Sequence, residues 1–193
     1  MCCCQSNERL HQKQSATART YPKDNAQMNK RWKPSVTVAA IIERDGRYLL
    51  IEEHTPEGLR LNNPAGHLDP GETPEAGCAR EALEETTYRF TPTALVGIYM
   101  SRLQRPAREG RAAEDITYLR FAYCGELGEQ VPGATLDTGI VRTLWMTADE
   151  VRAQNHRLRS PLVLRCIEEH AAGQRFPLHM IYTDPSVGNP SKG

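Results

Sequence analysis

Three acidic side chains that could act together lie near the end of a predicted helix over residues 74–86. Glu81, Glu84 and Glu85 are spaced i, i+3 and i+4, so a helix places their carboxylates within one arc of its surface. Like charges at this spacing repel and raise one another's pKa. A hard divalent cation would relieve the repulsion, and carboxylates suit Mg²⁺ or Mn²⁺, which usually share a phosphate with the substrate. The alternative is a solvated acidic face, which the spacing alone does not exclude.

The segment before this helix has the residues that position its start. Asp69-Pro70-Gly71-Glu72 predicts a β-turn, because proline presets φ at the first corner and glycine tolerates a positive φ at the next. Thr73 is the predicted N-cap, and Pro74 takes the first helical position, where a missing N–H is tolerated. The side of the helix opposite the carboxylates is modestly apolar, with Ala79, Ala82, Leu83 and Thr86. This pattern predicts that the helix packs on a sheet through that side.

A longer pattern connects the turn with the helix. Gly66 is followed after five residues by Glu72, and after seven more by the run Arg80-Glu81-Ala82-Leu83-Glu84-Glu85. This pattern resembles the Nudix box, the sequence motif of the Nudix hydrolases. Six specified positions at fixed spacing are a far more specific signal than a single glycine motif, so the resemblance favours a functional site over a solvated face.

Similarity continues outside the box, toward the bacterial NudJ-type phosphatase subgroup of this family. It involves residues 33–39, 63–68, 158–163 and 173–178, and with the box it covers most of 33–182. That subgroup is associated with release of inorganic phosphate from nucleoside tri- and diphosphates and from thiamine-pathway pyrophosphates. The resemblance therefore implies a small-molecule phosphate substrate, and it leaves open whether phosphate or pyrophosphate is released.

The resemblance also implies a fold and a reaction. The fold is a single α+β domain, an α/β/α sandwich around a mixed β-sheet. The reaction is attack of a metal-activated water on a phosphoanhydride bond, with Mg²⁺ as cofactor or Mn²⁺ in its place. The protein is expected to be a monomer or a homodimer. A catalytically silent nucleotide-binding module on the same fold is the alternative, although the three helix carboxylates of the box are all present.

Carried over position by position, the motif implies a role for each of its residues. The implied metal ligands are the carbonyl of Gly66 and the carboxylates of Glu81, Glu84 and Glu85. Glu72 would lie beside them, paired with Arg80, so that the implied catalytic group is Glu72, Arg80, Glu81, Glu84 and Glu85. Glu85 is the first candidate for the general base. Asp137 is the second, although its loop, residues 135–139, also favours a simple turn residue there.

Thr87 departs from the motif, because the family has glycine at this position. Glycine there closes the helix in a left-handed conformation, which a β-branched residue adopts only with strain. We therefore expect either a different exit turn or a loss of stability.

Apolar runs and turn residues predict the remaining elements. Strands are expected over residues 36–42, 47–52, 94–100, 116–124 and 141–146. Asp45-Gly46 predicts a hairpin between the first two strands. Helices are expected over 148–153, with a capping box of Thr147 and Glu150, and over 161–172. Strands, a helix and then more strands predict a mixed layered fold.

Length and charge limit the function classes. The 193 residues are 39% hydrophobic and carry no net charge at pH 7, which predicts one core and makes nucleic-acid binding unexpected. The apolar runs are far shorter than the roughly 18–20 residues that span a bilayer, and the first residues lack the apolar segment of a secretory signal. We therefore expect a cytoplasmic protein that makes no membrane contact.

The chain is expected to have three parts. Residues 1–32 predict a disordered basic arm, within which Met28 is an alternative translation start. Residues 33–182 predict the Nudix domain, and 183–193 a flexible tail. The cations of the arm leave an RNA-processing or regulatory role as a further alternative.

Several other side chains have a structural and a functional interpretation. Cys2, Cys3 and Cys4 are expected to be reduced, with a lipid or metal site as the alternative, whereas Cys78 and Cys124 are expected in the core. A solvated basic loop that could meet a polyphosphate is predicted at Arg102, Arg105, Arg108 and Arg111. Two interpretations stay open for His67, Trp145, Arg159 and Arg175, namely contact with the substrate or a structural or surface role.

Overall fold

The computed structural model describes residues 32–107, 110 and 112–188. All of its helices and strands belong to the unit that begins at Lys33. The predicted arm, apart from Trp32, lies outside the described residues, and so do Arg108, Arg111 and the three cysteines near the start. Among the helices of the described part, none has the length and apolarity needed to cross a membrane.

The described chain contains eight strands, three α-helices and three short 3-10 helices. The strands are β1 (Ser35–Ile41), β2 (Glu43–Arg44), β3 (Arg47–Thr55), β4 (Gly58–Asn62), β5 (Ala65–His67), β6 (Tyr88–Arg105), β7 (Glu114–Gln130) and β8 (Ile140–Met146). The helices are α1 (Pro74–Thr86), α2 (Ala148–Ala153), η1 (Asn155–Arg157), α3 (Leu162–Ala171), η2 (Leu178–Met180) and η3 (Pro185–Gly188).

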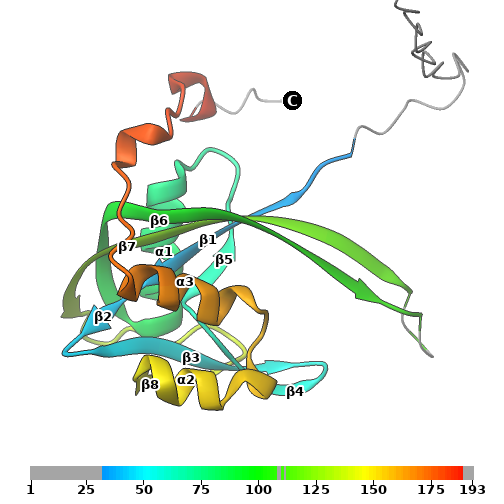
Figure 1. The fold of residues 1–193 in the computed structure, drawn as a ribbon. Coiled ribbons are helices and arrows are strands. Elements are labelled where there is room, and N and C mark those ends of the chain that lie inside the picture. The colour runs from blue at the N-terminus through cyan, green and yellow to red at the C-terminus, as the bar shows by residue number, and fades with distance from the viewer. Residues whose placement is uncertain (1–31, 108–109, 111, 189–193) are drawn as a thin grey trace, which may run out of the picture. The chain divides into compact units, whose positions relative to one another are not determined.

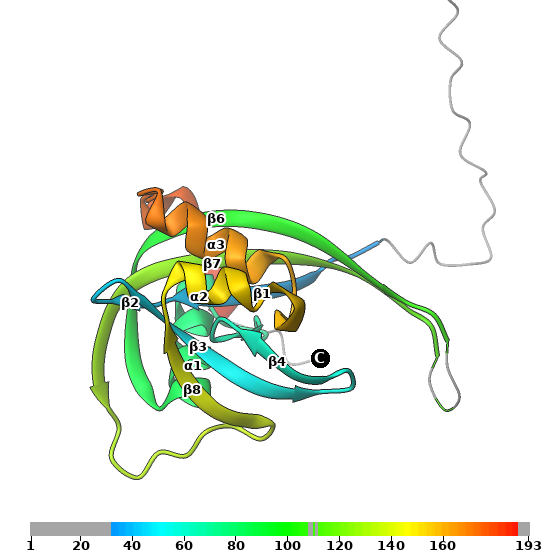
Figure 2. The same cartoon turned by 60° about the horizontal axis from the view of Figure 1, so that its bottom comes forward.

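The strands form two sheets. One has the order β5-β1-β7-β6, with β1 parallel to β7 and its other pairs antiparallel, so the expected mixed sheet is present. The second contains β2, β3 and β4, and β8 pairs with β3. The paired strands β6 and β7 extend as a long hairpin past the rest of their sheet (Figures 1 and 2).

Helices cover the first sheet on both faces, as expected for an α/β/α sandwich (Figure 1). Alternate residues of β1 point to opposite faces: Ala39 and Ile41 pack with α2 and α3, and Val38 and Ala40 pack with α1. The prediction that Cys78 and Cys124 are core residues is confirmed, since both are buried and free of disulfides.

Local sequence signals set the ends of the helices. The helix predicted over 74–86 is present with those bounds, and Thr73 caps it by accepting a hydrogen bond from the N–H of Ala76 at 3.1 Å. The predicted turn before it is closed by a bond of 3.2 Å from the Glu72 N–H to the Asp69 carbonyl. The capping box of Thr147 and Glu150 is also confirmed.

Strand lengths differ from the prediction. The strands predicted over 94–100 and 116–124 are parts of β6 and β7, which have 18 and 17 residues because each lengthens the ladder of the other. The sequence analysis did not identify β4 or β5. The prediction of a basic loop was wrong for Arg102 and Arg105, because both residues lie on β6.

The exit from α1 keeps the left-handed turn although it has no glycine. Thr87 has φ 66° and ψ 4°, and its N–H donates to the carbonyl of Leu83 at 2.8 Å. The side chain of Gln130 donates to the Thr87 hydroxyl at 3.0 Å, and the N–H of Val131 donates to the Thr87 carbonyl at 2.9 Å. These bonds hold a β-branched residue in a conformation that it adopts with strain.

We predict that Thr87→Asn raises the free energy of unfolding by about 1 kcal/mol, because asparagine tolerates the left-handed conformation and can still accept a hydrogen bond from Gln130. Urea denaturation measures this change. Thr87→Val, which keeps the branch and removes the acceptor, should lower the same quantity by about 1 kcal/mol. Equal losses in both variants would show that the turn is not strained.

Candidate active site

Arg80 connects the loop before α1 to the helix. Its Nε donates to Glu72 Oε1 at 2.6 Å and its Nη2 to Glu72 Oε2 at 3.0 Å, so the expected ion pair is present and bidentate. Nη2 also donates to the carbonyl of His67 at 3.0 Å. On the helix itself, Nη1 donates to Glu81 Oε1 at 2.7 Å and to Glu84 Oε2 at 2.9 Å. One guanidinium therefore fixes the loop and orients two acidic side chains.

Glu81 lies directly against the backbone of Gly66 in β5. A Cβ atom built on Gly66 would lie 2.2 Å from the carboxylate atoms of Glu81, so no other residue type fits here without displacing that side chain. Burial raises the pKa of Glu81, although the hydrogen bond and charge of Arg80 oppose this. The glycine of the box thus makes room for a carboxylate beside its own carbonyl.

Glu85 of α1 is held by Ala65, the residue of β5 that precedes Gly66. Its Oε2 accepts a hydrogen bond of 2.7 Å from the N–H of Ala65, and the residue is 9% exposed. Burial, together with the charges of Glu81, Glu53 and Asp137, raises the pKa of Glu85 to about 8, against the opposing hydrogen bond from Ala65. The site therefore concentrates carboxyl groups where little water reaches, and this disfavours the charged form of Glu85.

The loop that contains Asp137 lies on the last turn of α1. The N–H of Asp137 donates to the carbonyl of Glu84 at 2.9 Å, and its own Oδ1 accepts from the N–H of Thr138 at 2.6 Å. Asp137 thus makes the hydrogen bond of a turn residue. Its charge also acts on Glu85, so it lies near the candidate site as well.

The box residues fit a divalent cation by their chemistry. They offer only oxygen donors, and the glycine position leaves space for one of the carboxylates. Arg80 holds Glu81 and Glu84, however, and within residues 32–107, 110 and 112–188 no three acidic, histidine or cysteine side chains stand ready around one metal position. Binding a cation therefore requires these carboxylates to exchange the guanidinium for the metal.

A cavity of about 240 Å³ adjoins the box. Ala65, Gly66 and His67 form part of its wall, so the cavity adjoins the strand against which Glu81 and Glu85 lie. Other lining residues come from β1, β4, β7 and the start of α3, among them Thr37, Asn62, Arg120 and Ser160. Arg159, which had a surface role as its alternative, also lines this cavity and lies 3.6 Å from Glu53.

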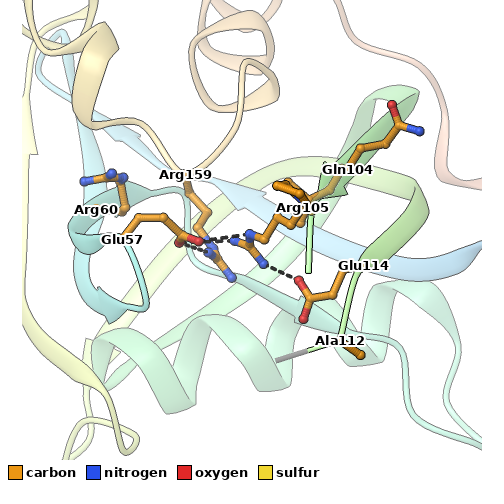
Figure 3. Close-up of a pocket in the computed structure, with 9 residues that line it drawn as sticks. Glu57, Arg60, Gln104, Arg105, Ala112, Glu114 and Arg159 are labelled. Carbon is orange, nitrogen blue, oxygen red and sulfur yellow. Dashed lines mark hydrogen bonds and ion pairs between the residues drawn. The ribbon is translucent and has the colours of Figure 1, made fainter. Parts of the chain in front are cut away.

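Figure 3 shows a second cavity, of about 320 Å³, which shares Arg105 and Arg159 with the first. Arg105 lies between two carboxylates there, with its Nε 2.9 Å from Glu57 and its Nη1 2.7 Å from Glu114. Arg102 is likewise paired, with Asp115 at 2.6 Å. These two arginines of the predicted basic loop are therefore paired with carboxylates on β7 or in the turn after β3.

The fold places the three other candidate side chains in different surroundings. His67 is exposed and lines the first cavity, with its ring 6.3 Å from that of Tyr118. Trp145 packs against the core beneath α1, under the guanidinium of Arg44. Arg175 donates to the carbonyl of His170 at 3.0 Å, and it does not line either cavity described above.

Three buried polar residues of the first cavity were not predicted from the sequence to belong to a site. Thr37, Asn62 and Arg120 are buried residues of three different strands, each with a side-chain atom that has no partner in the described part of the chain. Of these three, Arg120 alone could have been identified from the sequence, because it is a charged residue in the middle of an otherwise mostly apolar predicted strand. The fold alone brings the other two to the same cavity.

Comparisons with known proteins agree with this site. The model of the NUDIX domain family matches residues 31–166. The Escherichia coli K12 protein Phosphatase NudJ is 35% identical over 150 residues, which cover 78% of this chain and 92% of NudJ. A NUDIX hydrolase from Nitrosomonas europaea is 46% identical with a TM-score of 0.67, over 79% of this chain and 98% of that one.

A MutT NUDIX hydrolase from Burkholderia pseudomallei shares the fold, with a TM-score of 0.54 at 22% identity over 72% of this chain and 98% of that one. The family match covers more than half of the chain and includes the whole of the box. The chain therefore belongs to the Nudix hydrolases.

Proposed function

We propose that this protein hydrolyses phosphoanhydride bonds of nucleoside di- and triphosphates, of thiamine-pathway pyrophosphates, or of both, with Mg²⁺ as cofactor. The relationship to Phosphatase NudJ supports a phosphatase-type activity. The observation that carries the proposal is the contact between Glu81 and Gly66, because it sets a carboxylate against a residue that lines the adjoining cavity.

The proposed ligands are the carbonyl of Gly66 and the carboxylates of Glu81, Glu84 and Glu85. A bound divalent cation supplies Lewis acidity, which lowers the pKa of a water and offsets charge on phosphoryl oxygens. Mn²⁺ has similar ligand preferences and is expected to substitute. Low exposure of Glu81 and Glu85 strengthens electrostatic attraction there compared with bulk water.

The other box residues act on position and on protons. Arg80 is a positioning residue, since its contacts to Glu72 and to the His67 carbonyl hold the loop in place. Glu85 is the proposed general base, because it is buried beside Ala65 of β5 and its pKa is raised to about 8, within reach of the operating pH. Asp137 is the second candidate, and its Oδ1 already accepts from the N–H of Thr138.

We predict that Glu84→Gln and Glu85→Gln each lower Mg²⁺-dependent phosphate release by about 100-fold or more, equivalent to roughly 3 kcal/mol of lost transition-state stabilisation. The assay uses nucleoside di- and triphosphates, thiamine pyrophosphate and its pyrimidine pyrophosphate precursor. EDTA should abolish turnover by the unaltered protein.

Glu75→Gln is the matched control, because Glu75 lies on the same helix at a position that the box does not specify, and this variant should retain its activity. Tight binding of one substrate without turnover would instead favour the silent binding module.

We predict that Gly66→Ala removes activity, because the added methyl group must displace the Glu81 carboxylate from the strand. The thermal midpoint should change little in this variant, because the atoms that must move are the flexible end of one side chain. Differential scanning calorimetry and phosphate release measure the two effects.

The double variant Gly66→Ala/Glu81→Ala separates steric strain from chemistry. It should remain inactive although the clash is gone, because the carboxylate is gone as well. Full activity in Gly66→Ala would contradict the proposed arrangement.

A further inference from the structure

Arg120 is the least compensated charge of the cavity beside the box. It lies in the middle of β7, is 8% exposed, and lines the cavity wall. Its Nη1 is buried without a hydrogen-bond partner, and no ion pair joins this arginine to any described residue. Burial of an unpaired cation is costly, so a partner that arrives with a ligand would explain why it is kept there.

The other arginines of this cavity are already paired. Arg102 and Arg105 bind carboxylates at 2.6 to 2.9 Å, and Arg159 lies 3.6 Å from Glu53. Glu53, the one acidic residue in this wall, also accepts a hydrogen bond of 3.2 Å from Asn62. The positive charge available to a ligand is therefore that of Arg120.

The N-terminal end of α3 opens onto the same cavity. Ser160, Pro161 and Leu162 line it, and this ten-residue helix begins at Leu162 without a side-chain cap at Pro161. The Leu162 N–H lies 3.3 Å from the Ser160 hydroxyl oxygen, a long bond. The positive end of the helix dipole thus faces the space that Arg120 lines, and both favour an anion.

We propose that Arg120 and the N-terminus of α3 form a subsite for a second phosphoryl group of the substrate, next to the one that is attacked. This inference rests on the proposed function. Gly66 and His67 line the cavity together with Arg120, and Thr37 of β1 is the register partner of both His67 and Arg120, so the box and the guanidinium border one space. Thr37, which pairs with Arg120 across β1 and β7, adds a hydroxyl without a described partner.

Arg120→Met tests the subsite because it separates binding from stability. Titration calorimetry with inorganic pyrophosphate, in EDTA, should show affinity about 10- to 100-fold weaker than that of the unaltered protein, the range for a lost charge-assisted hydrogen bond. In Mg²⁺, KM for the best substrate should rise by a similar factor. The thermal midpoint should stay the same or rise, because an unpaired buried cation has been removed.

Arg152→Met is the matched control, since Arg152 is an exposed arginine of α2 paired with Glu168 and Asp149. Its pyrophosphate affinity should not change. Arg120→Lys keeps the charge and provides a second variant if the methionine variant fails to fold, and it should bind pyrophosphate less tightly than the unaltered protein.

Three outcomes would overturn the subsite. One is an unaltered protein that binds no pyrophosphate, and another is unchanged affinity in both Arg120 variants. The third is unchanged pyrophosphate affinity with weaker binding of the free nucleoside, which would assign the cavity to the organic part of the substrate. Pyrophosphate binding that depends on Arg120 without any turnover would leave the subsite intact and contradict only the proposed hydrolysis.

Discussion

The guanidinium of Arg80 is the interaction on which the site depends. It binds Glu72 and the carbonyl of His67 on the loop, and Glu81 and Glu84 on the helix, so the two halves of the box have one relative position. A single positive charge serves three carboxylates, and a net negative charge remains. This excess is the electrostatic reason for a divalent cation at the box, because the cation can take over the helix carboxylates while Arg80 keeps its bidentate pair with the loop.

The cavity beside the box divides binding between two charges of opposite sign. The acidic side is the box itself, where Glu81 and Glu85 lie against Gly66 and Ala65 of β5, and the basic side is Arg120 of β7, which lines the cavity together with the start of α3. A substrate with linked phosphoryl groups matches both sides, since its oxygens can share a cation on one side and accept hydrogen bonds on the other. The sandwich makes this possible because β1 places β5 and β7 on its two edges.

The box could be predicted from the sequence because its residues are neighbours along the chain. Thr73 and Pro74 set the start of α1, and the spacing of Glu81 and Glu85 then determined the face on which they lie. The cavity could not be predicted in this way. Arg120 and Asn62 come from strands far apart in sequence, and their meeting depends on strand order and register, which periodicity does not encode. The order of the predicted elements indicated a mixed layered fold, whereas the α/β/α sandwich and the reaction class came from the family resemblance.

A crystal structure grown with Mn²⁺ and an unreactive diphosphate analogue would test the central claim most directly, since anomalous scattering locates the metal. Our account predicts manganese bound by the Gly66 carbonyl and by carboxylates of Glu81, Glu84 and Glu85, with Arg80 still paired to Glu72. Manganese absent from the box, with Arg80 still holding both Glu81 and Glu84, would contradict it.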